Sequence, residues 1–278
     1  MTAQPPSLKG LDLIAEIARL KQERNAVILA HYYQKPEIQD LADFVGDSLD
    51  LSRKAAATDA DVIAFCGVRF MAETAKILSP EKIVVLPDMD AGCSLEDSCP
   101  PAQFKAFREA NPDLIALTYI NCSAAVKALS DIIVTSSSAE AILDHADMVG
   151  STSAILKFAI DSPAQTILVA TEPHIIHQME KAAPAKTFIG VPGGDGNCNS
   201  NVCPYMAINT LEKLYVALRD LEPRIELSLD VMDRARVPLQ RMLDMAGGTV
   251  GKGDVGRPKL KADELDAGTL SGPQVSGE

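Results

Sequence analysis

The stretch AVILAHYYQKPEIQDLADFVGDSLDLSRKAAATDADVIAFCGVRFMAETAKILSPEKIVVLP, residues 26–87, decides the fold of this chain. Short apolar runs alternate in it with amphipathic runs. Pro36 marks the start of one helix and Pro80 the end of another. Strands that alternate with helices form a parallel sheet covered on both faces, so we predict an α/β fold of three-layer αβα units. The predicted strands are 26–33, 44–48, 62–67 and 82–87.

One phrase of this stretch recurs twice further along the chain. LADFVGDS (41–48) returns as LSDIIVTSS (129–137) and as HADMVGSTS (145–153), with Asp43, Asp131 and Asp147 as the shared acids. The first two acids lie 88 positions apart and the last two only 16. Repeated phrases imply repeated units. The short second interval predicts that roughly seventy residues are absent between the second and third copies.

A second repeated pattern ends in loops that contain cysteine. The stretch that begins VIAFCG ends at Cys93, and the similar stretch that begins TILVATE ends near Cys198 and Cys203. Each is predicted as strand, turn, helix, strand and cysteine loop. Any βαβ segment resembles another to some degree, but the matching loops favour a repeat. We therefore predict a complete unit at 1–105, partial units at 106–144 and 145–246, and a flexible tail at 247–278.

Two C-terminal helices complete the predicted third unit. The run YMAINTLEKLYVALRDL (205–221) is predicted as one amphipathic helix. The run VMDRARVPLQRMLDMA (231–246) is predicted as another, bent or started at Pro238.

Composition excludes some classes of function. The formal net charge is −12 over 278 residues, so phosphate backbones repel the chain and we expect no nucleic-acid partner. No apolar run is long enough to cross a bilayer, and MTAQPPSLKG does not resemble a secretory signal. We expect a cytoplasmic protein without membrane contact. In a reducing compartment its six cysteines are not expected to form a disulfide scaffold.

Cys93 and Cys203 are the strongest candidates for chemistry. Each ends a βα unit in a loop that contains Gly and Asp, and Pro follows Cys203, as it does in one iron–sulfur motif. Thiolates suit Zn²⁺ or an iron–sulfur cluster, but neither loop has CxxC spacing. The residues alone leave metal ligation and structural thiols both open. Cys66, inside VIAFC, is predicted to belong to the core.

Polar residues follow several predicted strands, where ligands of parallel sheets gather. His31 and Tyr33 end the first strand, and Tyr119 and Asn121 hold the equivalent place in the second unit. Hydroxyls open three predicted helices and can cap them or help to bind an anion. Glu172, His174 and His177 surround a later strand end, where a metal-binding or a solvent-facing histidine pair is possible. The three hydroxyl residues are Ser48, Ser136 and Thr152.

These motifs together resemble the quinolinate synthase (NadA) family. The stretches that carry the resemblance are AHYYQKPEIQDLADFVGDSL, CGVRFMAETAKIL, DAGCSLEDSCP, YINCSAAVKALSDIIVTSS, VGSTSAIL, VATEPHIIHQM, CPYMAIN and VPLQRMLD, and they span about 25–246. The resemblance implies three α/β units around a pseudo-threefold axis. It also implies a [4Fe–4S] cluster that acts as a Lewis acid, held by one cysteine of each unit.

The implied reaction condenses iminoaspartate with dihydroxyacetone phosphate to give quinolinate for NAD synthesis, with a functional link to L-aspartate oxidase. By position, Cys93 and Cys203 match cluster ligands, and Tyr33 matches a tyrosine at the mouth of the site. Tyr119 matches the tyrosine of the family's YxN pair. We therefore expect His31, Tyr33 and Tyr119 to be catalytic. The residues that match substrate contacts are His31, Ser48, Tyr119, Asn121, Ser136 and Thr152.

The chain departs from the family pattern in one place. The PDxxLGxY, WxGxCxxH and HPE segments are missing, and the second cluster cysteine is lost with them. Cys99, Cys122 or Cys198 could replace that ligand if the remaining units repack. Three hypotheses follow: a quinolinate synthase, a non-catalytic remnant whose exposed sheet edges invite association, and a generic phosphate binder with zinc in its cysteine loops.

Overall fold

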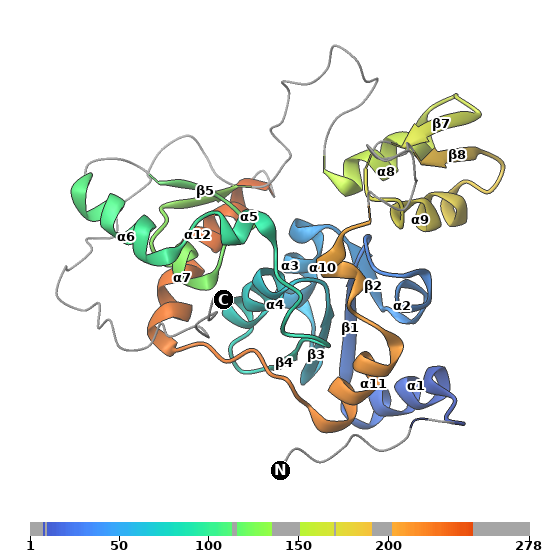
Figure 1. The fold of residues 1–278 in the computed structure, drawn as a ribbon, viewed down its shortest axis with the longest axis horizontal. Helices are drawn as coiled ribbons and strands as arrows, with labels where there is room; N and C mark the ends of the chain where they lie inside the picture. The colour runs from blue at the N-terminus through green and yellow to red at the C-terminus, as the bar shows by residue number, and fades with distance from the viewer. Residues whose placement is uncertain are drawn as a thin grey trace, which may run out of the picture.

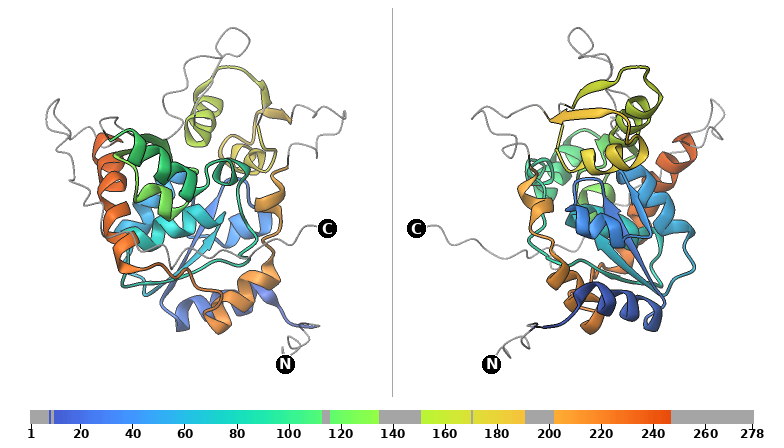
Figure 2. Two further views of the ribbon diagram at one scale, coloured as in Figure 1. Left: turned by 60° about the vertical axis from the view of Figure 1, so that its left-hand side comes forward. Right: turned by 90° about the vertical axis from the view of Figure 1, so that its right-hand side faces the viewer.

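The computed structural model describes residue 8 and residues 10–112, 116–134, 151–169, 171–190 and 202–246. Within these ranges the strands form three separate parallel sheets with helices around them (Figure 1; Figure 2). The predicted α/β class is therefore confirmed. The unit boundaries stay predictions, and the expected tail at 247–278 lies outside the described residues.

The first sheet has four strands in the order β2-β1-β3-β4. Successive residues of β1 and β3 belong alternately to two cores, one on each face of the sheet. Burial on both faces explains why these strands read as continuous apolar runs. Cys66 is fully buried in β3, as predicted from the sequence. The elements are α1 (Leu13–Glu23), β1 (Ala26–His31), α2 (Pro36–Leu41), β2 (Phe44–Gly46), α3 (Ser48–Ala57), β3 (Val62–Cys66), α4 (Arg69–Leu78) and β4 (Ile83–Val85).

The other two sheets have two strands each among the described residues. β5 pairs with β6, and β7 pairs with β8. They lie apart from each other, on different sides of the first unit (Figure 1; Figure 2). The elements are α5 (Ser94–Asp97), α6 (Pro101–Ala110), β5 (Leu117–Tyr119), α7 (Ala124–Lys127), β6 (Ile132–Val134), α8 (Thr152–Asp161), β7 (Thr166–Val169), α9 (Ile175–Ala182) and β8 (Thr187–Gly190).

Two of the repeated aspartates make equivalent contacts in the first and second units. Asp43 accepts the backbone N–H of Ile28 at 2.8 Å and pairs with Lys21 of α1. Asp131 accepts the backbone N–H of Ala116 at 2.7 Å and pairs with Arg108 of α6 at 2.9 Å. Each aspartate directly precedes the second strand of its pair. Its carboxylate binds a backbone N–H in or just before the first strand, and a basic side chain of the helix that precedes the first strand. Asp147 lies outside the described residues.

The C-terminal helices return to the first unit. The predicted single helix at 205–221 is wrong, because the structure divides it into α10 (Pro204–Ala207) and α11 (Leu211–Asp220). Thr210 caps α11 by accepting the N–H of Lys213, and buried Asn209 donates to the carbonyl of Gly67. α11 packs against α1. Among the described residues, no helix is both long and apolar enough to cross a membrane.

The last helix, α12 (Leu229–Ala246), is continuous and contains Pro238 in its interior. It packs against α4 of the first unit and against α7 and β6 of the second. Arg236 donates to the carbonyl of Ile77 at 3.1 Å, and Arg241 donates to the carbonyl of Asp131 at 2.8 Å. α12 therefore fastens the β5–β6 sheet to the first unit.

Candidate functional site

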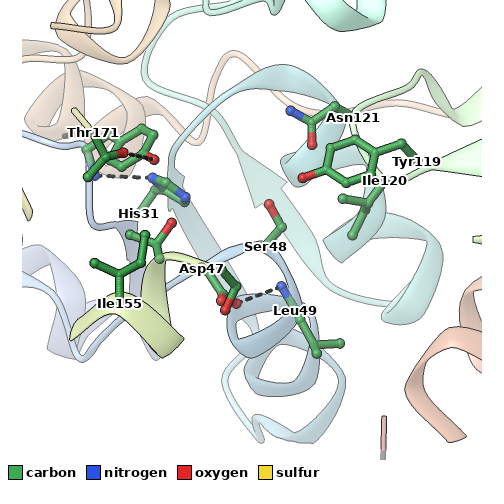
Figure 3. Close-up of a pocket in the computed structure, with 12 residues that line it drawn as sticks. His31, Asp47, Ser48, Leu49, Tyr119, Ile120, Asn121, Ile155 and Thr171 are labelled. Carbon is green, nitrogen blue, oxygen red and sulfur yellow. Dashed lines mark hydrogen bonds between the residues drawn. The ribbon is translucent and has the colours of Figure 1, made fainter. Parts of the chain in front are cut away.

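A cavity of about 170 Å³ lies where parts of all three units converge. Six of the residues predicted from the sequence lie on its wall, and Figure 3 shows most of them around one central space. The lining residues are His31, Tyr33, Asp47, Ser48, Leu49, Tyr119, Ile120, Asn121, Ser151, Thr152, Ile155 and Thr171.

His31, the last residue of β1, is buried, with 5% of its surface exposed. Burial lowers its pKa to about 4, although the nearby charge of Asp47 acts in the opposite direction. The imidazole is therefore neutral near pH 7. Its Nδ1 accepts the backbone N–H of Tyr33 at 3.1 Å, which leaves the proton on Nε2. His31 can therefore act as a neutral hydrogen-bond donor at the cavity wall.

Two ten-residue helices begin at the cavity. Asp47 caps α3 by accepting the N–H groups of Leu49 and Asp50, and Ser48 is the first residue of that helix. Ser151 caps α8 by accepting the N–H of Ala154, and Thr152 is its first residue. Helix N-termini carry partial positive charge, so both helices favour an anionic group between them. Asp47 and Ser151 escaped the sequence analysis, although each directly precedes a predicted hydroxyl.

A hydrogen bond joins the first and third units at the wall of the cavity. The hydroxyl of Tyr33 and the Oγ1 of Thr171 lie 3.1 Å apart (Figure 3). Thr171 is a lining residue that the sequence analysis missed. Nearby, the hydroxyl of Ser153 donates to the carboxylate of Asp50, which joins the start of α8 to α3. These contacts hold the third unit against the first.

The second unit contributes Tyr119 and Asn121 to the cavity wall, as the equivalence with His31 predicts. The amide of Asn121 also donates to the Sγ of Cys93, over a distance of 3.6 Å. Cys93 precedes the short helix α5 and is half-buried. The predicted ligand loop of the first unit therefore adjoins the wall of the cavity at Asn121.

Cys203 lies near Cys93. Burial raises the pKa of the Cys203 thiol, backbone N–H groups of Met206 and Tyr205 lower it, and Glu172 and Cys93 raise it further. The ring of Tyr205 also lies against Gly92, the neighbour of Cys93. The two cysteines selected from the sequence thus lie within the range of an electrostatic interaction.

The thiols of the described residues do not suffice for a [4Fe–4S] cluster. No three His, Cys, Asp or Glu side chains within those residues form a metal-binding group. Burial raises the pKa of Cys122 to about 11. A buried neutral thiol is a poor ligand. Cys198, the remaining candidate, lies outside the described residues, as does Ser136.

The histidines of the third unit have separate partners. His174 bonds the carboxylate of Glu172 at 2.7 Å, which raises the pKa of His174. His177 bonds Asp40 of α2 at 2.9 Å. Asp40 also pairs with Lys181 of α9. The contacts of His177 and Lys181 with Asp40 dock α9 on the first unit. Among the described residues the two histidines belong to no metal-binding group.

The fold and the cavity define an α/β protein with parallel sheets and a cavity lined by residues of several of its predicted units. The family model described as quinolinate synthetase A protein (NadA) matches residues 15–146 and 138–244. The chain belongs to this family.

Curated relatives named quinolinate synthase match most of the chain. The protein from Trichormus variabilis is 46% identical over 313 residues, which cover 87% of this chain and 96% of the relative. The proteins from Thermosynechococcus vestitus and Prochlorococcus marinus are each 46% identical to this chain. The alignments cover 98% of the first protein and 94% of the second.

The comparisons also locate the missing segment. The alignment with the first relative runs over 313 positions, whereas 87% of this chain is about 242 residues, so about 71 positions of the relative have no counterpart here. The two family matches overlap at 138–146. Both observations agree with the predicted loss of roughly seventy residues between the second and third copies of the repeated phrase.

Proposed function

We propose that this chain binds the substrates of quinolinate synthase in the cavity and acts in NAD biosynthesis. The proposed reaction condenses iminoaspartate with dihydroxyacetone phosphate to give quinolinate, and it links the chain functionally to L-aspartate oxidase. The observation that carries this proposal is the convergence of six predicted site residues, contributed by the regions around β1, β5, α3 and α8, on one small cavity.

The chemistry of the cavity wall suits a small dicarboxylate. Neutral His31 offers an Nε2–H donor, and the starts of α3 and α8 offer partial positive charge. Tyr119 and Asn121 add a hydroxyl and an amide from the opposite unit. We propose that these groups orient the carboxylates, and that the Tyr33–Thr171 hydrogen bond limits access of water at one side.

The proposed cofactor needs a further ligand. In the family reaction a [4Fe–4S] cluster supplies Lewis-acid chemistry. Cys93 and Cys203 can provide two thiolates of the three that such a cluster would take, and the described residues provide no third. The third thiolate would then have to come from Cys198. A second candidate function follows from the lack of a third thiolate among the described residues: the chain binds quinolinate without catalysing its formation.

One experiment separates the two functions. The chain is purified without oxygen, reconstituted with iron and sulfide, and assayed for cluster absorbance and for quinolinate. A cluster together with product supports the enzyme. Binding of quinolinate without product supports the second candidate. A protein that neither binds quinolinate nor forms it would contradict both functions.

A matched pair of variants tests the cavity itself. His31→Asn keeps an acceptor for the N–H of Tyr33 but removes the Nε2–H donor, so quinolinate affinity measured by calorimetry should fall about tenfold or more. His177→Asn alters a histidine outside the cavity and should leave the affinity unchanged. Equal affinities of the wild type and His31→Asn would contradict the proposed role of His31.

A further inference from the structure

The described elements of the second and third units each correspond to a different half of the first unit. In the first unit the elements follow the order β1, α2, β2, α3, β3, α4, β4. After α6 the described elements follow the order β5, α7, β6, then α8, β7, α9, β8. The second series repeats the first, element for element. β5 and β6 therefore correspond to β1 and β2, and β7 and β8 correspond to β3 and β4.

The strand registers support this correspondence. Leu29 lies opposite Phe44 in the first unit, and Leu117 lies opposite Ile132 in the second, which is a shift of 88 positions in both strands. Val62 lies opposite Ile83, and Thr166 lies opposite Thr187, which is a shift of 104 positions in both strands. The half sheets thus keep the pairing geometry of the complete sheet.

The contact that joins the two halves in the first unit has no counterpart among the described strands of the other two units. There β1 pairs with β3, and Leu29 lies opposite Phe65. In the part of the chain that the structure describes, β5 and β7 each pair on one side only. Unpaired strand edges attract further strands. The incomplete burial of the third sheet agrees: Ile189 is 46% exposed, whereas Val85 at the equivalent position is 0% exposed.

Different contacts hold the two sheets whose edges are unpaired among the described residues. α12 fastens the β5–β6 sheet on one side of the first unit through Arg241. Asp40 holds α9, and with it the β7–β8 sheet, on another side. Figures 1 and 2 show the two sheets apart. A second copy of the chain can pair with both edges and leave these contacts intact.

We propose that this chain forms a dimer in which β5 of each copy pairs in parallel with β7 of the other. The pairing completes two four-stranded sheets of the order β6-β5-β7-β8, which matches β2-β1-β3-β4. A twofold axis makes the pairing occur twice, and this doubles the area buried by a short strand edge. The shifts of 88 and 104 place Leu117 opposite Val169.

Disulfide trapping tests this register. The double variant Leu117→Cys with Val169→Cys should give a covalent dimer on mild oxidation, seen on a non-reducing gel. The control Leu117→Cys with Thr166→Cys is three residues out of register, roughly 10 Å along the strand, and should give several-fold less dimer. The wild type measures the background from the native cysteines. Equal dimer in both double variants, or a disulfide within one chain, would overturn the proposal.

The wild-type chain provides a test that does not depend on the folding of variants. Its mass is measured by light scattering over a dilution series, and amide hydrogen exchange is followed in the same samples. As the concentration rises, the mass should double and the amides of 116–119 and 166–169 should gain protection. A monomer at every concentration, or a dimer without added protection at these strands, would refute the pairing.

Discussion

At the scale of single residues, the hydrogen-bonding character of the cavity wall depends on His31. Its imidazole is buried near the carboxylate of Asp47. Burial dominates and keeps the ring neutral. The backbone N–H of Tyr33 then selects which ring nitrogen carries the proton. A neutral ring with a fixed tautomer can recognise an anionic ligand through one directed hydrogen bond.

The lowered pKa of His31 predicts a pH dependence of stability. Between its ordinary value of about 6.5 and about 4, the unfolded chain binds a proton at this site that the folded chain does not. The contribution of His31 is therefore complete above pH 6.5 and falls by about 3 kcal/mol as the pH drops to 4. The free energy of unfolding of the wild type, compared with His31→Asn at each pH, measures it.

Other groups titrate in the same experiment, so the comparison with the variant is essential. His174 has a raised pKa because of its bond to Glu172. It therefore stabilises the fold below pH 6.5, and this contribution is lost as the pH rises through its folded pKa. A difference between wild type and His31→Asn that stays constant from pH 7 to pH 4 would contradict the assignment.

Asp131 gives a second prediction at this scale. Asp131→Ala removes the acceptor of the Ala116 N–H and leaves Arg108, which is largely buried, without this carboxylate. The free energy of unfolding should fall by about 2–3 kcal/mol. Asp161→Ala removes only an exposed ion pair with Lys157 and should cost less than about 0.5 kcal/mol. Similar losses in the two variants, measured by urea titration, would argue against the anchoring role.

At the scale of elements, helix caps set the boundaries that hydrophobic patterns cannot define. The apolar period runs unbroken through 205–221, so the pattern predicts one helix there. The buried amide of Asn209 instead bonds the carbonyl of Gly67, a partner 142 residues away that no local pattern reveals. Where Pro36 and Pro80 supply local signals, by contrast, the predicted helix limits agree with α2 and α4 within a few residues.

The cap of α11 can be tested directly. Thr210→Ala removes the acceptor for the N–H of Lys213 and should lower the free energy of unfolding by about 1 kcal/mol. Thr210→Ser keeps the hydroxyl and should cost only a few tenths of that. Equal destabilisation of the two variants in chemical denaturation would show that the methyl group of Thr210, rather than the cap, is responsible.

At the scale of the whole molecule, the repeat spacing predicts the shortened architecture, and residue equivalence predicts half of the cavity wall. His31, Tyr119 and Thr152 could be found because they occupy matching strand or helix ends. Thr171 could not, because its importance depends on how the third unit docks against Tyr33. Docking between units is a tertiary property that the local sequence does not encode.

A double-mutant cycle measures that docking. Tyr33→Phe and Thr171→Val each remove one hydroxyl of the hydrogen bond between the first and third units. The two changes should be non-additive by about 0.5–1.5 kcal/mol in the free energy of unfolding. Strict additivity would mean that this bond does not couple the units.

The aspartate anchors also bear on how the chain reaches its native state. Asp43 contacts a residue 15 positions away, and Asp131 does the same. Short loops cost little entropy to close, and contacts between nearby positions form early. Each strand–helix–strand half can therefore nucleate independently, before any long-range assembly. A chain built from such self-starting pieces can lose a central stretch and still complete its first folding steps.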